Sequence, residues 1–148
     1  MGWIKRKVED LYKKYKTRNP FTIAKFLNIE IVYWDLPLDI NGFYQYERRN
    51  RFIFINNNLS LEEQLVVCAH ELAHALFHKN VNTSFMRQNT FLSVSKIEIE
   101  ANTFAAHLLI SDECLQDYLT EQKTIQDIAS LHNLPLELVE LKCKKLFL

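Results

Sequence analysis

Glycine is almost absent from this sequence, since Gly2 and Gly42 are the only two among its 148 residues. The chain also has only three prolines, and it contains no internal repeat, low-complexity tract or Gly/Ser-rich linker at which it could be divided. A chain of this length is the size of one domain. We therefore expect residues 1–148 to fold as a single domain.

Cysteine is also scarce. Cys68, Cys114 and Cys143 are odd in number and far apart, so they offer neither a disulfide framework nor the paired spacing of a cysteine zinc site. Residues 1–4 lead straight into charged residues without the apolar stretch of a secretory signal, and no segment approaches the ~18 apolar residues of a membrane span. We expect a cytoplasmic protein with no membrane partner.

Charge of one sign is not in excess, because 18 Lys and Arg residues balance 18 Asp and Glu residues. No overall field would attract the chain to nucleic acid, and we expect no direct nucleic-acid partner. The first 18 residues are the exception, with a basic majority: Lys5, Arg6, Lys7, Lys13, Lys14, Lys16 and Arg18. The favoured interpretation is the solvated face of an amphipathic helix, and a contact surface is the alternative.

Apolar residues are abundant, at 48% of the chain, and indicate a packed core. Their spacing, with capping residues such as Ser60, predicts the following elements: helices at about 4–17, 20–27, 60–79 and 95–110, strands at 29–34, 42–46 and 51–56, and shorter helices after Ser111, Thr124 and Pro135. Helices, then a few strands, then helices predict an α+β fold. We expect a small antiparallel sheet packed on the helix at 60–79.

That helix carries the motif His70-Glu71-Leu72-Ala73-His74. Residues four apart on a helix lie about 40° around and about 6 Å along its axis, so His70 and His74 can bind one metal ion. Zinc is the natural choice, although such a site would also accept other divalent metals. Glu71 can reach a metal-bound water without being a ligand, which makes it the candidate general base of a hydrolase.

The alternative interpretation of this motif is a pair of core histidines beside an ordinary surface glutamate. An apolar stripe that includes Leu65, Leu72 and Leu76 already gives the helix a packing face, so the histidines are not needed for that purpose. His78 continues the series but lies about 12 Å along the axis from His70. It cannot share the same ion, and we expect it to support the site from outside or to be structural.

The third ligand has to come from another segment, and the helix at 95–110 offers Glu98 and Glu100. Because they lie about 200° apart, only one of them can face the histidines. Small neighbours favour Glu98, whereas Glu100 shares with His107 a polar face that we expect to meet solvent. Asn102, one turn after Glu98, is placed to support a ligand from outside the coordination sphere. Ser95 with Glu98 also matches a capping box, which is the alternative role for this carboxylate.

Two stretches of this sequence, His70–His78 and Glu98–Leu109, together resemble the ImmA/IrrE family of metallopeptidases. Shorter matches at residues 19–24, 41–44 and 52–56 extend the similarity to roughly residues 18–112. The sequence departs from the family at Ala73, where many members have Gly, and at Ile110-Ser111, where a Pro often follows the Leu-Leu pair. Neither difference affects a residue of the candidate site.

This resemblance implies a gluzincin-like zinc endopeptidase in a single zincin-like domain, with residues 18–112 as catalytic core and 113–148 as a helical C-terminal part. It implies zinc bound by His70, His74 and Glu98, with Glu71 as the catalytic residue. Members of the family cleave helix-turn-helix repressors of phages, integrative elements or stress regulons, so such a repressor is the expected substrate and partner. The alternative is a catalytically silent metal-binding regulator or a protein-interaction module on the same fold.

A substrate of such an enzyme is expected to add as an extra strand along a sheet edge. We hypothesise that Gly42–Tyr46 or Arg51–Asn56 offers that edge and that residues 81–94 border the cleft.

Overall fold

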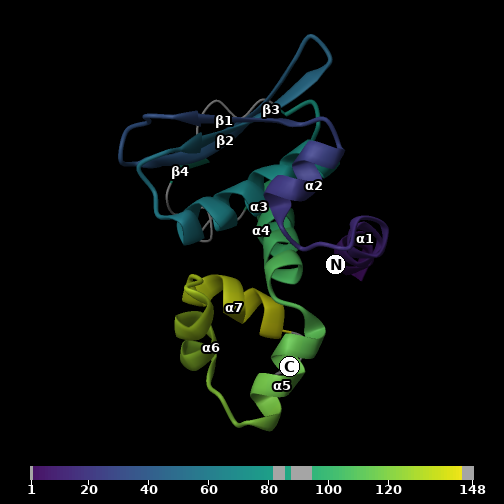
Figure 1. Ribbon diagram of the computed structural model, residues 1–148, viewed down its shortest axis with the longest axis vertical. Coiled ribbons are helices and arrows are strands. Elements are labelled where there is room, and N and C mark those ends of the chain that lie inside the picture. Colours follow the sequence, from purple (N-terminus) through teal and green to yellow (C-terminus); the bar gives the residue numbers. More distant parts are fainter. Residues whose placement is uncertain (1, 82–85, 88–94, 145–148) are drawn as a thin grey trace.

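The computed structural model describes residues 2–81, 86–87 and 95–144. Within them the elements follow one another in the order α1 (Gly2–Tyr15), α2 (Pro20–Phe26), β1 (Glu30–Trp34), β2 (Ile40–Glu47), β3 (Asn50–Asn56), α3 (Leu61–Phe77), β4 (Met86–Arg87), α4 (Lys96–Leu109), α5 (Asp112–Thr120), α6 (Ile125–His132) and α7 (Leu136–Cys143) (Figure 1). The α+β class is confirmed. None of the described helices is long and apolar enough to cross a membrane.

The strands form a sheet of order β1-β3-β2-β4. Strands β2 and β3 make the predicted hairpin, and Arg48 and Arg49 between them have φ of 50° and 65°, as a tight two-residue turn requires. Strand β1, however, pairs parallel to β3, from Glu30↔Phe52 to Trp34↔Asn56. The sheet is therefore mixed, and the prediction of an antiparallel sheet was wrong for its first strand.

The parallel pairing follows from the path between β1 and β2. The segment that connects β1 to β2 passes the end of β3. Strand β3 follows β2 in the sequence but lies between β1 and β2 in the sheet, where it pairs with both. The buried Asn56 at the end of β3 holds the connection, because its amide nitrogen donates to the carbonyl oxygens of Leu36, Pro37 and Ile40 at 2.9–3.2 Å. These bonds join segments far apart in sequence, so no local sequence pattern predicts them.

Helix α3 packs against β2 and β3, and Figure 1 shows α2 and α3 on the same face of the sheet. It begins at the predicted capping box, in which Ser60 and Glu63 bond to each other's backbone nitrogen. The close approach of helix and sheet depends on Gly42. A Cβ atom there would collide with the carbonyl oxygen of Phe54 and would lie 2.7 Å from Cγ1 of Val67 on α3.

Helix α4 lies across α3 and also packs against α1 and α7, so most of its surface is covered. Its buried residues Ala101, Phe104, Ala105 and Leu108 belong to the main core, which also contains the inner face of the sheet. A smaller apolar cluster joins Ile110 to α5, α6 and α7. Glu98 and Glu100, which lie on the two faces that the sequence distinguished, are therefore both buried.

Candidate metal centre

His70, Glu71 and His74 lie in the buried middle of α3, with exposed fractions of 5%, 1% and 0%. The two imidazoles point to the same place, since their Nε2 atoms are 3.2 Å apart. The one-turn spacing on a helix produces this convergence, as the sequence predicted. Among the described residues, these three make a group whose potential ligand atoms all lie within 4.8 Å of one another.

Glu98 reaches the same point from α4. Its Oε2 lies 2.9 Å from Nε2 of His70 and its Oε1 lies 3.0 Å from Nε2 of His74, so one carboxylate spans both rings. Ser95 makes no side-chain capping hydrogen bond, so the alternative role of Glu98 in a capping box is not realised. The structure thus brings together the four residues that the sequence assigned to the site.

Glu71 stands slightly apart from this cluster. Its Oε1 is 3.9 Å from Nε2 of His70, about 1 Å further than the carboxylate of Glu98. Burial raises the pKa of Glu71 to about 7, although the neighbouring His70 opposes the shift. A carboxylate with a pKa near neutrality can both accept and release a proton under physiological conditions, as a general base must.

The cluster has the ligand types of a metal site and contains buried polar atoms that make no hydrogen bond. Burial alone would raise the pKa of Glu98, yet the two histidines lower it to about 2 and keep it ionised. Among the described residues, Oε2 of Glu71 is buried with no hydrogen-bond partner, and the buried Oε2 of Glu98 lies 2.9 Å from Nε2 of His70 without making a hydrogen bond. Such atoms are costly unless something else satisfies them. Two imidazoles and a carboxylate are the ligand set of catalytic zinc, so the residues present fit a divalent cation.

The outward ring nitrogens of both histidines are also bonded. Nδ1 of His70 lies 2.7 Å from Oδ1 of Asn102, so Asn102 contacts a candidate ligand, and its supporting role stays a prediction. Nδ1 of His74 lies 3.0 Å from Nδ1 of His78. His78 therefore contacts His74 from outside the cluster, and Nε2 of His78 faces Glu100 instead of the cluster. Bonds of this kind fix the tautomer and orientation of a ligand histidine.

Glu100 is the residue that the sequence analysis placed incorrectly. It is buried, with 8% of its surface exposed, and its Oε1 lies 3.0 Å from Nε2 of His78. The expectation of a solvent-facing Glu100 was wrong because α4 is covered by α1, α3 and α7 and has no polar outer face at this point. The signal that could have found the pair is His78 itself, a third histidine at the end of a buried helix, which needs a polar partner.

Comparison with known proteins gives the family. A family model described as "IrrE N-terminal-like domain" matches residues 24–144. "Metallopeptidase ImmA" of Bacillus subtilis (strain 168) is 31% identical over 134 residues, which cover 89% of this chain and 79% of that protein. The chain belongs to the ImmA/IrrE family. Membership supports a metallopeptidase-type function with a metal cofactor, in agreement with the His-Glu-His group on α3.

A phage protein is similar to this ImmA/IrrE family member as well. "Uncharacterized immunity region protein 2" of Bacillus phage phi105 is 47% identical over 139 residues, which cover 94% of this chain and 88% of the phage protein. Both relatives therefore match the chain over nearly its whole length, and the family model extends through the C-terminal helices to residue 144.

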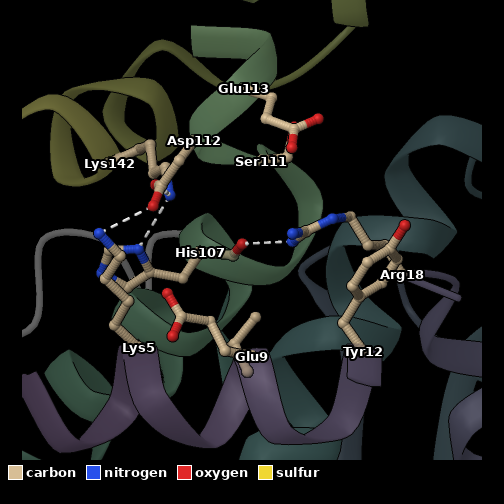
Figure 2. Close-up of a pocket in the computed structure, with 10 residues that line it drawn as sticks. Lys5, Glu9, Tyr12, Arg18, His107, Ser111, Asp112, Glu113 and Lys142 are labelled. Atoms are coloured by element: carbon tan, nitrogen blue, oxygen red, sulfur yellow. Dashed lines mark hydrogen bonds and ion pairs between the residues drawn. The ribbon is translucent and has the colours of Figure 1, made fainter. Parts of the chain in front are cut away.

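His107, the other polar residue expected on the outer face of α4, lies in a separate ionic cluster. Figure 2 shows it beside Lys5, Asp112 and Lys142, around a pocket of about 300 Å³. Asp112 pairs with Lys142 at 2.5 Å and with Lys5 at 2.8 Å, and Lys142 also donates to Nδ1 of His107. Every cation of this cluster has a partner, so the cluster connects α1, α4, α5 and α7 and has no part in the metal centre.

Proposed function

We propose that this chain is a zinc-dependent endopeptidase that cleaves a helix-turn-helix transcriptional repressor. The observation that carries the proposal is the convergence of Glu98 with His70 and His74 beside Glu71, at a buried point where one oxygen of each carboxylate makes no hydrogen bond among the described residues. Zinc bound there would act as a Lewis acid on a water molecule and on the carbonyl group of the peptide.

Each side chain of the centre then has a defined task. His70, His74 and Glu98 would hold the ion, and the hydrogen bond of Asn102 would keep the ring of His70 in place. Glu71 is close to the ion site without occupying it, so that its carboxylate can take the proton of the attacking water and pass it to the leaving amine. Its burial favours this role, because the nearby charges act more strongly where water is excluded.

The substrate class rests on the family resemblance and on the phage relative, whose name places it in an immunity region. A repressor is a folded protein, so a selective enzyme must present a defined surface to one of its segments. The hypothesis that β3 (Asn50–Asn56) offers a free sheet edge was wrong, because β3 is paired on both sides. Strand β2 pairs with β4 at Ile40 and Gly42, so Gly42 itself is already paired. For the rest of the Gly42–Tyr46 stretch, substrate addition stays a prediction. The hypothesis for residues 81–94 lies mostly outside the described residues.

Cleavage by the purified, zinc-loaded chain tests this function. We expect a helix-turn-helix repressor encoded in the same genetic neighbourhood to be cut at a single site, and a chelator to abolish the cut. Casein, a generic unfolded protein, should be a poor substrate. Rapid and unselective digestion of casein would contradict the proposed specificity, and cleavage that survives complete removal of metal would contradict the proposed chemistry.

The ligand role of Glu98 has its own test. Glu98→Ala leaves two imidazoles to hold the ion, so the variant should purify with little zinc and no activity while its helices persist. Glu62→Ala, which removes an exposed carboxylate at the start of α3, is the matched control and should change stability by no more than about 0.5 kcal/mol. Normal zinc content in Glu98→Ala would remove Glu98 from the ligand set.

A further inference from the structure

Three polar side chains form a continuous line outward from the candidate metal centre. Nδ1 of His74 meets Nδ1 of His78 at 3.0 Å, and Nε2 of His78 meets Oε1 of Glu100 at 3.0 Å. His78 is the residue that ends α3, with φ of −128° and ψ of 45°, and its backbone nitrogen also donates to the carbonyl of His74. Its position at the helix end lets its ring lie between α3 and the Glu100 side chain on α4.

The direction of these hydrogen bonds follows from the role of His74. A neutral histidine that offers the lone pair of Nε2 to a metal carries its proton on Nδ1. Nδ1 of His74 must then donate to His78, whose Nδ1 accepts. The remaining proton of His78 is on Nε2, from which it is donated to the carboxylate of Glu100. With His74 bound to a metal through Nε2, this arrangement of protons satisfies the hydrogen bonds of all three residues.

We propose that His78 and Glu100 are positioning residues that fix the tautomer and orientation of His74 and increase its strength as a metal ligand. This inference rests on the proposed function, since it concerns the same centre. The two ligand histidines are supported differently. His70 donates to the neutral amide of Asn102, whereas His74 is connected through one imidazole to a carboxylate. Polarisation by that negative charge strengthens the Nε2 lone pair of His74 as a metal ligand.

Burial gives the arrangement its strength. The side chains of His78 and Glu100 are only 8% and 11% exposed, so water competes weakly for either hydrogen bond. A glutamate and a histidine on an exposed helix face would gain little from such a pair. Here the carboxylate lies in the interior, where Oε1 of Glu100 pairs with Nε2 of His78 at 3.0 Å.

Metal affinity is the direct test, measured by competition with a chromophoric chelator on the full chain. Replacement of a residue that orients a metal ligand typically weakens binding about 10–100-fold. We expect His78→Phe to weaken zinc binding by close to 100-fold, because phenylalanine keeps an aromatic ring but loses both hydrogen bonds. Glu100→Gln keeps a hydrogen-bond acceptor but removes the charge, and should weaken zinc binding by about 10-fold. His132→Phe and Glu62→Gln, equivalent changes far from the centre, should bind zinc like the parent.

The absorption spectrum of the Co²⁺-substituted protein provides a second readout that a purely structural role would not change. We expect altered d–d bands in His78→Phe and Glu100→Gln but not in the controls. If both variants bind zinc with parental affinity and give the parental Co²⁺ spectrum, the inference is wrong. If His78→Phe does not fold, Glu100→Gln decides alone. A parent chain that binds no metal would instead refute the proposed function, so the two failures are distinguishable.

Discussion

His70 and Asn102 are 32 positions apart in the chain, yet Nδ1 of the histidine lies 2.7 Å from Oδ1 of the asparagine in the buried contact between α3 and α4. The amide oxygen can only accept, so His70 must carry its proton on Nδ1. Its Nε2 is then left with a free lone pair that faces His74 and Glu98. A single hydrogen bond between two helices thus prepares one ligand of the candidate metal centre.

Asn102→Leu removes this acceptor without leaving a large void. We expect zinc affinity to decrease about 10-fold or more, because the ring of His70 loses its fixed orientation and its proton loses a partner. Asn102→Asp keeps an acceptor at the same position and should retain most of the affinity. Chelator competition measures both variants, and parental affinity in Asn102→Leu would show that this bond does not support the centre.

Much of the fold could be predicted from the sequence because its signals are local. The proline after Asn19, the Ser60–Glu63 box and the caps at Ser111 and Thr124 each mark a helix start that the structure contains. His70 and His74 could be brought together by helix geometry alone. Each of these predictions depends on residues no more than about four positions apart.

The features that were missed depend on long-range packing. The parallel pairing of β1 is stabilised by Asn56 and a distant connection, and no alternation of residues encodes it. The burial of Glu100 depends on the helices that cover α4, which no helical periodicity within residues 95–110 can show. Glu98 and Glu100 are both buried acids on one helix, and only the tertiary contacts assign the former to His70 and His74 and the latter to His78.

Gly42→Ala should lower the free energy of unfolding by about 1–3 kcal/mol, because the new Cβ would meet the backbone oxygen of Phe54 and the side chain of Val67. The carbonyl cannot move without distorting the β2–β3 pairing. Gly2→Ala is the matched control, since nothing lies within 4 Å of a Cβ there and alanine favours the helix. Denaturant unfolding measures both, and equal stability of the two variants would contradict the close contact at Gly42.

Asp112→Asn should weaken the attachment of the C-terminal helices at neutral pH. Burial opposes the ionisation of Asp112, but its bonds to Lys142 and Lys5 lower its pKa from 3.8 to about 2. A lowered carboxyl pKa means that the ionic bonds stabilise the fold fully above about pH 4 and are lost as the pH falls towards 2. We expect a loss of about 1–2 kcal/mol at pH 7, limited because about half of the Asp112 side chain is exposed.

The difference between Asp112→Asn and the parent should therefore shrink steadily below pH 4. Glu113→Gln changes a neighbouring carboxylate in the same first turn of α5, and it controls for the general effect of charge at this helix start. Urea unfolding at several pH values gives the comparison. A difference that stays constant down to pH 2 would show that the effect of Asp112→Asn is not electrostatic.

The most direct measurement of the central claim compares the parent chain with Glu71→Gln, both loaded with zinc and both assayed on a repressor substrate. The amide is nearly isosteric with the carboxylate and is not a ligand, so we expect each protein to hold about one zinc ion. It cannot accept the proton of a water molecule, and peptide cleavage should fall to the background of the assay. Parental cleavage by the zinc-loaded Glu71→Gln protein would contradict the account.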